Sequence, residues 1–533
     1  MSTLAFSQAV TVKGLVKDSG NKKPLVGANV YITGTGMGTS TSDEGRYNIA
    51  NVSPGTYTLK ASYIGYESEE IEITVAAGEE LEQDFELNYV TIEGKTVEVT
   101  AQARGQMDAI NKQLKAKSIK NIISSDRIQE LPDANAAEAV ARVPGVSIRR
   151  EGGEGNKVVI RGLSPKYNKI TVNGTNLAST DADDRSTDLS MISQYMLEGI
   201  EVTKAGTPDQ EADVLGGTVN FKLKKAPSGL HGNLVTQGMY NSLKKTQDDY
   251  KLVFDISNRF FGDRLGLLGQ IDLENRNRSS HNLAANYVNT PADLDTINPL
   301  TLETLTLKDV ARQNNRDNNL FVIDYNIPNG NITYSGLHST INKDITTYAN
   351  VYPLQTPDGR RNFDTGELLN RIKVTSETWK YEQQLSPDLK LDLFKSFSRS
   401  TNGDTTKVYN FRETAAYTAD VGNKSVDNIQ EFTVNDTNAT WFERYDYNEY
   451  STSETEHAFG GNVEFDLKIN DQISGKVKFG FKNRDKTREH DRDYEYATFT
   501  YVGMTAKRDT TYKMFEFLNS IPSGTIYAPY YPF

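Results

Sequence analysis

The chain has 533 residues, a formal net charge of −12 and no cysteine. Without cysteine it can form no disulfide, thiolate metal site or cysteine nucleophile, and an acidic chain with scattered lysines is a poor partner for nucleic acid. No segment reaches about 18 consecutive apolar residues, so the sequence predicts no membrane-spanning helix. The absence of a long apolar segment does not exclude strands that cross a membrane, because such strands alternate polar and apolar side chains.

Residues 1–9, "MSTLAFSQA", are apolar and end in small residues at Ser7 and Ala9. This pattern is typical of the end of a secretory signal peptide cleaved before Val10, and we interpret 1–9 as its residual tail. An ordinary frayed N-terminus explains nine residues equally well, because the positively charged start of a signal peptide is missing.

Residues 10–88 alternate hydrophobic and polar side chains in several short runs between turn residues, which predicts a small β-sandwich. The segments "PLVGANVYITGT", "TSDEGRYNI" and "PGTYTLKASYIGY" resemble those of carboxypeptidase-regulatory-like (transthyretin-like) domains. The resemblance implies a stable periplasmic spacer. No His-x-x-Glu zinc pair occurs in the sequence, so no peptidase activity is implied.

Residues 89–105 form a link, and residues 106–225 are predicted to form a compact α+β unit. Helical patterns occur at "MDAINKQLKAK", "SSDRIQEL" and "NAAEAVARV", the last of which ends at Pro144-Gly145. Strands are expected at "GVSIRR", "KVVIRG", "KITVNG" and "GGTVNFKLK". Asn173-Gly174 requires positive φ angles, which predicts a tight hairpin turn.

In residues 226–533, apolar and polar side chains alternate over long segments, with a period of two residues. In "FGGNVEFDLKI", one set of alternating positions is apolar: Phe459, Val463, Phe465, Leu467 and Ile469. The intervening Glu464, Asp466 and Lys468 are expected on the opposite face. Long strands with one apolar face and unequal loops are typical of an outer-membrane barrel, although a soluble β-sandwich gives the same alternation.

Three segments of the α+β unit carry a more specific signal. "LPDANAAEAVARVPGV", "VVIRGLSPKYNKITVNGT" and "LEGIEVTKAGTPDQEADVLGGTVNFKLK" occur in this order and together resemble the plug of TonB-dependent outer-membrane transporters. The resemblance implies a mostly β fold: a transthyretin-like sandwich, an α+β plug and, over 226–533, the first part of a large antiparallel transmembrane β-barrel. The plug resembles the branch with an "RYN-x-x-x-VNG"-like stretch, with Lys166 where arginine is common, more than the SusC branch.

The resemblance also implies a function and a location. The chain would lie in the bacterial outer membrane as a multi-pass barrel with a periplasmic N-terminal domain, and would import an extracellular nutrient with energy from TonB. Its implied partners are TonB, outer-membrane lipid and an unknown extracellular substrate, with a surface lipoprotein or accessory subunits as further candidates. No enzyme activity, metal or cofactor is expected. The rival interpretation is a non-transporting surface binding or adhesion protein built of β-rich modules.

Two physical expectations follow from a plug inside a barrel. A plug that is displaced by pulling should contact the wall through polar, hydrated groups, because an apolar seam would resist displacement. Residues 226–533 offer about ten strands of the ~9–11 residues that a membrane crossing needs, whereas plugged transporters use about 22 strands. We therefore expect further barrel strands beyond residue 533.

The candidate TonB box lies in the link, within "TVEVTAQ": Val97, Glu98, Val99, Thr100 and Ala101. An extended segment of this kind can pair edge to edge with a strand of a periplasmic partner, which then pulls through main-chain hydrogen bonds. The alternative is that these residues form the first strand of the plug.

Two polar loops of the plug are candidates for contact with substrate, the glycine-rich "REGGEGNK" and the acidic "STDADDRSTD". Their candidate residues are Arg150, Glu151, Glu154, Asn156, Asp181, Asp183, Asp184 and Arg185. The acidic loop lacks the glycine and distal glutamate of an EF-hand, so it is not expected to bind calcium. Arg161, Glu201 and Lys204 are candidates for contacts between plug and barrel, although pairing within the plug would explain them equally well.

Overall fold

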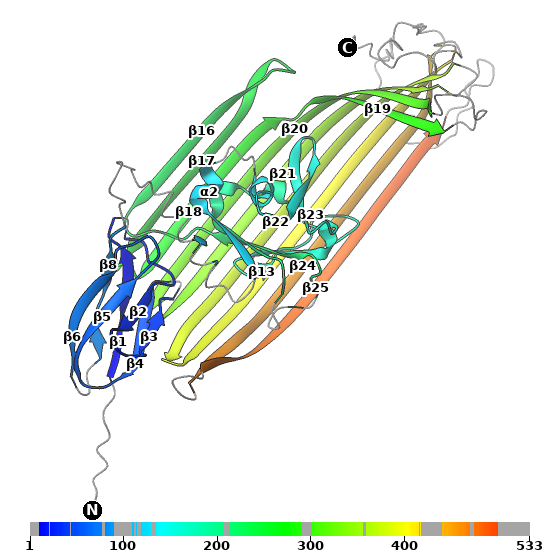
Figure 1. Ribbon diagram of the computed structural model, residues 1–533. Helices are drawn as coiled ribbons and strands as arrows, with labels where there is room; N and C mark the ends of the chain where they lie inside the picture. Colours follow the sequence, from blue (N-terminus) through cyan, green and yellow to red (C-terminus); the bar gives the residue numbers. More distant parts are fainter. Residues whose placement is uncertain are drawn as a thin grey trace, which may run out of the picture.

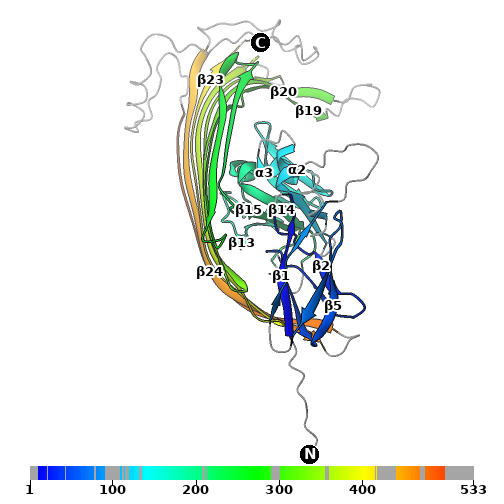
Figure 2. The ribbon, with the colours of Figure 1, turned by 90° about the vertical axis from the view of Figure 1, so that its left-hand side faces the viewer.

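The computed structural model describes residues 10–20, 22–42, 44–76, 80–89, 109–110, 113, 119–130, 135–206, 211, 213–289, 300–354, 359–414, 416, 440–468 and 474–498. They form a β-sandwich, an α+β unit and one long, curved antiparallel sheet (Figure 1). The α+β unit lies against the concave face of the long sheet, and the sandwich lies near one end of its strands (Figure 2). Within the described residues, no helix is long and apolar enough to cross a membrane.

The sandwich consists of two four-stranded sheets. One sheet contains β1 (Val10–Asp18), β4 (Arg46–Val52), β7 (Leu81–Glu82) and β8 (Phe85–Leu87). The other contains β2 (Asn29–Ile32), β3 (Gly38–Ser40), β5 (Gly55–Ser62) and β6 (Glu69–Val75). Every second side chain of β1 is buried, as expected for a strand with one face in a core. The buried cluster contains only residues between Val10 and Leu87, so the sandwich closes its own core.

The α+β unit is built on a five-stranded sheet of order β13-β12-β15-β14-β9, with a separate hairpin β10-β11. Its strands are β9 (Lys120–Ser124), β10 (Val146–Glu151), β11 (Glu154–Ile160), β12 (Asn168–Val172), β13 (Thr175–Asn176), β14 (Leu197–Thr203) and β15 (Gly217–Leu223). Its short helices are α2 (Ser125–Glu130), α3 (Ala136–Val140), η1 (Pro165–Tyr167), η2 (Leu189–Met191) and η3 (Gln194–Met196). Within the described residues, β9 is an edge strand that pairs with β14 alone.

Local sequence signals explain two features of this unit. Asn173 and Gly174 have φ angles of 49° and 85°, which confirms the predicted hairpin turn between β12 and β13. Asn135 caps α3, because its side-chain oxygen accepts hydrogen bonds from the backbone nitrogens of Ala137 and Glu138 at 3.0 and 3.2 Å.

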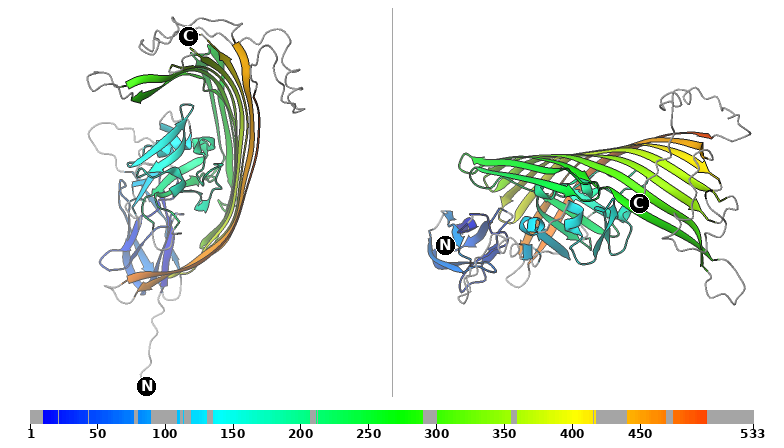
Figure 3. Two further views of the ribbon diagram at one scale, coloured as in Figure 1. Left: turned by 90° about the vertical axis from the view of Figure 1, so that its right-hand side faces the viewer. Right: turned by 90° about the horizontal axis from the view of Figure 1, so that it is seen from above.

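The long sheet has ten described strands, all antiparallel to their neighbours. They are β16 (His231–Asn241), β17 (Thr246–Phe260), β18 (Leu265–Asn277), β19 (Ser280–Asn289), β20 (Leu300–Ile327), β21 (Gly330–Pro353), β22 (Arg361–Ser386), β23 (Leu389–Glu413), β24 (Thr440–Lys468) and β25 (Ser474–Thr498). β18 and β19 pair with successive parts of β20. The sheet curves around the α+β unit without closing, as the two views of Figure 3 show.

The two faces of the long sheet differ as the period of two predicts. Phe459, Val463, Phe465 and Leu467 of β24 are exposed on the convex face, while Glu464 and Asp466 point to the concave face. The predicted register is therefore confirmed for these residues. Ile469 and the side chain of Lys468 lie outside the described part of the chain. The predicted fold class is also confirmed, since strands dominate all three parts.

Candidate functional site

The α+β unit and the long sheet share one apolar cluster at the centre of their contact. Its sheet members, each at most 4% exposed, are Leu268, Leu320, Val322, Leu337, Ile341, Ile372 and Val374. From the α+β unit it includes Leu189 and Met191 of η2, which lies against β21. The prediction of a purely polar contact surface is therefore wrong at this centre. The unit covers these side chains and keeps water away from them, so apolar residues are stable there.

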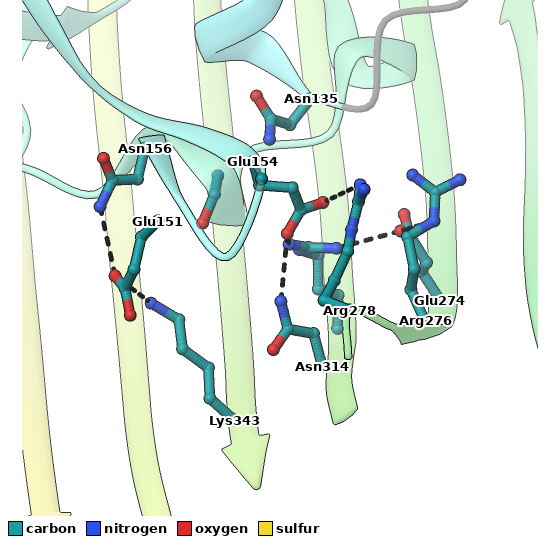
Figure 4. Close-up of polar contacts among 12 residues, drawn as sticks. Asn135, Glu151, Glu154, Asn156, Glu274, Arg276, Arg278, Asn314 and Lys343 are labelled. Carbon is teal, nitrogen blue, oxygen red and sulfur yellow. Dashed lines mark hydrogen bonds and ion pairs between the residues drawn. The ribbon is translucent and has the colours of Figure 1, made fainter. Parts of the chain in front are cut away.

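A buried charge cluster lies beside this apolar centre, around Glu154 of β11 (Figure 4). The Glu154 carboxylate accepts hydrogen bonds from Arg278 at 2.8 Å and from Asn314 at 3.1 Å, and it pairs with Arg316 of β20. Arg316 also reaches Glu274 of β18 at 3.0 Å. Burial alone would raise the pKa of Glu154, but the two guanidinium groups lower it to about 2. The carboxylate is therefore charged at neutral pH and holds the unit to Asn314 and Arg316 of β20 and to Arg278, which lies between β18 and β19.

A second group of charges centres on Lys343 of β21. Its amino group lies 3.0 Å from the carboxylate of Asp188 and 3.3 Å from that of Glu151. Burial alone would raise the pKa of Asp188, but Lys343 lowers it below its usual value. Glu151 also lies 3.3 Å from Arg312 of β20. Lys343 thus joins both candidate loops, because Glu151 belongs to the glycine-rich loop and Asp188 to the acidic one.

The glycines of the glycine-rich loop permit this close approach. Gly152 has a φ angle of 56°, and a Cβ atom built on it would lie 2.5 Å from a guanidinium nitrogen of Arg312. A larger residue would therefore strain the backbone and displace the arginine. By contrast, Cβ atoms at Gly216 and Gly217 would meet Asn168 and Thr203, which belong to the α+β unit itself. The close approach to the long sheet is thus made by Gly152.

The acidic loop is bound by the last described strand of the sheet. Arg488 of β25 donates to the backbone carbonyls of Asp181, Ala182 and Asp184 at 2.6, 2.9 and 2.8 Å. Burial alone would raise the pKa of Asp181, but its hydrogen bonds with Lys157 and with the following backbone amides lower it. Among the described residues, no group of three or more carboxylates and histidines is arranged to hold a metal ion.

The segment after the hairpin turn makes further contacts that the sequence analysis missed. The backbone amide of Ser179 donates to Glu454 at 2.8 Å, and that of Ala178 donates to Ser398 at 2.8 Å. The Asn176 side chain donates to Glu456 at 2.9 Å. Glu454 and Glu456 occupy alternate, inward positions of β24. Their spacing of two was visible in the sequence, but nothing there indicated which strand segment the loop would reach.

Glu211 is another wall contact that was not predicted. It pairs with Lys169 and lies 2.5 Å from Lys482 and 3.1 Å from Arg484 of β25. Burial alone would raise the pKa of Glu211, whereas its hydrogen bonds with Lys169 and Lys482 lower it to about 2. The cations on alternate positions of "KVKFGFKNRDKTR" were a usable signal for an inward-facing basic strand.

The predicted substrate-facing residues therefore have mixed surroundings. Glu151, Glu154 and the backbone of Asp181 and Asp184 contact the long sheet. The other candidates make contacts inside the α+β unit: Arg150 with Glu138 at 2.5 Å, Asn156 with Glu151 at 3.3 Å, Asp183 with Asp181 at 2.9 Å, and Arg185 with the backbone of Asp213 at 2.9 Å. A role of these residues in substrate contact stays a prediction.

The three residues predicted to contact the barrel wall are placed differently. Glu201 lies 3.5 Å from Lys120, and Lys204 donates to the backbone carbonyl of Pro144. Arg161 is exposed, with a φ angle of 55° in the turn after β11. The contacts of Glu201 and Lys204 are within the α+β unit, as in the alternative interpretation, and contact of the three residues with the barrel stays a prediction. The candidate TonB box, Val97 to Ala101, lies outside the described residues.

The sequence matches two protein families in the order in which the domains occur. Residues 12–99 match the CarboxypepD_reg-like domain, and residues 112–218 match the TonB-dependent Receptor Plug Domain. Among curated proteins, the TonB-dependent receptor SusC of Bacteroides thetaiotaomicron is 26% identical over 280 residues, which cover 50% of this chain and 26% of SusC. The TonB-dependent receptor P39 of Formosa agariphila is 30% identical over 146 residues, or 26% of this chain and 13% of P39.

The matched region therefore spans about a quarter of the first of these relatives and less of the second. The plug segments resembled another branch of these transporters more than the SusC branch. The similarity to SusC weighs against that interpretation. Among solved structures, the ferric preacinetobactin receptor BauA of Acinetobacter baumannii aligns with 71% of this chain and 60% of its own, at 12% identity and a TM-score of 0.33. The domain matches identify the chain as a TonB-dependent receptor of the outer membrane, with a CarboxypepD_reg-like domain, a plug and strands of an antiparallel β-barrel.

Proposed function

We propose that this receptor binds an extracellular nutrient and imports it into the periplasm with energy supplied by TonB. The observation that supports this proposal most directly is that the two plug loops predicted to face substrate also contact the long sheet. Residues 150–157 and 179–188 were predicted to face substrate, and they also carry Glu154, Glu151 and Asp188, which hold the plug to the sheet. A ligand that moves either loop would therefore change the charge pairs that seat the plug.

The apolar centre of the interface bears on how the plug would open. Seven apolar side chains of the sheet are buried against the plug. Each contributes roughly 1.5–3 kcal/mol when fully buried, so expelling the whole plug would cost on the order of 10 kcal/mol or more. A pull that first opens one edge of the plug avoids most of this cost.

Strand β9 is well placed to be that edge. It is the first described plug strand after the link that contains the candidate TonB box, and it pairs only with β14 among the described residues. Its first residue, Lys120, lies opposite Thr203. Tension from the link would load this pair first and would separate the strands one pair at a time, each main-chain hydrogen bond contributing only about 0.5–1.5 kcal/mol.

The absence of cysteine allows a direct test with an engineered disulfide. In the double variant Lys120→Cys/Thr203→Cys, oxidation should join β9 to β14 and should block accumulation of the ligand recovered from the native membrane by pull-down. Ligand binding to whole cells should be unchanged, and a reductant should restore accumulation. Unimpaired accumulation in the oxidised variant would refute opening at β9.

A matched control places the disulfide between two plug strands that are not at the edge. Thr171 and Asn220 lie opposite each other on β12 and β15, and their side-chain oxygens are 3.0 Å apart. Oxidised Thr171→Cys/Asn220→Cys should still accumulate ligand. If both disulfides block accumulation while binding persists, a larger part of the plug must rearrange.

The coupling segment is tested separately. Deleting residues 96–101, or replacing Val97 or Val99 by proline, should abolish accumulation and leave ligand binding unchanged, because strand addition needs the main-chain donors that proline lacks. Glu98→Gln should have a much smaller effect, because the pairing is mostly main-chain. Accumulation at the wild-type rate in the proline variants would place the TonB contact elsewhere.

A further inference from the structure

The convex face of the sheet contains a hollow of about 450 Å³, on the side opposite the plug. Its apolar lining comes from Phe254, Ile256, Ile271, Phe321 and Tyr334. The hollow exists because glycines occupy the two outward positions beside Phe321: Gly269 on β18 and Gly336 on β21 lie directly opposite it. We call this feature the outer hollow. Its size is within the roughly 300–1,000 Å³ that is usual for small-molecule pockets.

Three cations share the same convex face farther along the strands. Arg371 and Lys373 are exposed on β22, and Arg399 is exposed on β23. We call them the cationic trio. Their cross-strand neighbours are uncharged: Asn342 and Gly403 for Arg371, Thr340 and Thr401 for Lys373, Thr375 and Thr455 for Arg399. Two acids on this face, Asp344 and Glu377, are offset by two residues from the positions opposite Arg371 and Arg399. Two more are farther away: Asp317 lies on β20 opposite Thr340, and Glu367 lies four residues before Arg371 on β22. Within the described residues, the trio forms no ion pair.

The outer hollow and the cationic trio are continuous. His338, at the rim of the hollow, is 3.1 Å from the hydroxyl of Thr375, which lies opposite Arg399. Gly336 and Thr340, the residue opposite Lys373, are four residues apart on β21, or about 13 Å along a strand. The convex face thus has an apolar site and a cationic site about 13 Å apart along the strands. A membrane lipid needs such a pair of sites, one for its acyl tail and one for its headgroup.

The aromatic side chains mark the level of this surface in the membrane. Tyr334 packs on Trp379 with ring centroids 4.7 Å apart, directly below the rim of the hollow. Tyrosine and tryptophan are enriched where the apolar band of a barrel meets the headgroups. Along β22, Lys373 and Arg371 lie six and eight residues before Trp379, on the side away from the turn that joins β22 to β23, so the trio lies beyond the aromatic level, at headgroup height.

We propose that an anionic, phosphate-bearing lipid binds here, with one acyl chain in the outer hollow and its phosphate on the cationic trio. Guanidinium groups bind phosphate oxygens in bidentate geometry, and a lysine adds a third positive charge. A zwitterionic lipid carries its own cation beside the phosphate and is bound less well. This inference depends on the membrane location of the receptor and is independent of whether it transports a nutrient.

Trp379 provides a local probe, because the chain has only one other tryptophan, Trp441. The Trp441→Phe receptor is reconstituted in phosphatidylcholine bilayers that contain either brominated phosphatidylglycerol or brominated phosphatidylcholine, whose bromines quench tryptophan fluorescence. Half-quenching should need an at least roughly fivefold lower fraction of the anionic lipid, since one engaged cation alone gives about this enrichment at a membrane surface. Equal quenching by the two lipids would overturn the proposal.

Variants test whether the cationic trio and the outer hollow each contribute to the preference for the anionic lipid. Arg371→Ala/Lys373→Ala/Arg399→Ala should abolish the preference for the anionic lipid, whereas Arg264→Ala/Lys407→Ala, which removes cations elsewhere, should retain it. Gly269→Leu should fill the outer hollow and weaken quenching, since a Cβ atom there meets no atom within 4 Å. Gly475→Leu is the matched control, because Gly475 is equally open. If dissolved inorganic phosphate removes the preference, the trio binds phosphate without a lipid and the proposal is wrong.

Discussion

The sandwich and the plug bury their cores in different ways. The core of the sandwich, with Val12, Val30 and Leu59, is complete within its own two sheets. The core of the plug continues into side chains of the long sheet, including Leu337, and is flanked by shared charge pairs such as Glu154–Arg316. The sandwich should therefore keep its fold whatever happens at the sheet, whereas the plug loses part of its core and its charge pairs when it leaves the sheet. A receptor that opens by moving its plug needs this second arrangement.

The largest effect on this difference is expected for Glu154→Ala. Removing one member of a buried ion pair leaves an uncompensated charge and costs about 3–5 kcal/mol. Hydrogen exchange of plug amides should accelerate accordingly, with no change in the sandwich. Arg150→Ala is the control, because the Arg150–Glu138 pair is partly exposed within the plug and should contribute only about 0–1 kcal/mol. Equal acceleration in both variants would contradict the assigned role of Glu154.

A pair of core substitutions compares the two regions directly. Leu337→Ala and Leu59→Ala each remove a fully buried leucine, which costs about 2–5 kcal/mol. Leu337 belongs to the long sheet, yet its loss should loosen the plug. The loss of Leu59 should accelerate hydrogen exchange only in the sandwich. If Leu59→Ala also loosened the plug, the two cores would be coupled and the comparison would fail.

Acid should loosen the plug before it affects the sandwich core. The folded-state pKa of Glu154 and that of Glu211 are both lowered to about 2, below the usual glutamate value, so their pairing stabilises the seated plug above about pH 4.5. That stability should be lost as the pH falls through the interval from about 4.5 to 2. Protease sensitivity of the plug, measured across this interval, checks the prediction. Glu154→Gln should reduce the pH dependence, and an unchanged profile would show that other groups control it.

The smallest effect is expected in the glycine-rich loop. Gly152→Ala and Gly153→Ala both place a side chain at positive φ, which costs about 1–2 kcal/mol. Only at residue 152 would the new Cβ atom also meet Arg312, while residue 153 is open. Plug amides should therefore exchange faster in Gly152→Ala than in Gly153→Ala. The reverse order would mean that the approach of Gly152 to Arg312 does not help to seat the plug.

Much of the fold could be predicted from the sequence because it depends on local periodicity. The alternation in β24 placed Phe459 and Glu464 on opposite faces, and Asn173-Gly174 required a hairpin turn. Asn135 and the alanines after it marked the start of α3. The three plug segments resembled a known family over their full length. Each of these signals lies within a short stretch of chain, so no knowledge of distant contacts was needed.

The tertiary structure alone decided what lies between the plug and the sheet. Glu154 meets Arg316, which is 162 residues away, because the strand register and the curvature of the sheet bring β20 under the loop. The same geometry covers Leu337 and Ile341 and turns them into core residues, although inward positions of a barrel were expected to be wet. Alternation reveals which face a side chain occupies. Whether that face meets water or another domain depends on how distant segments pack together.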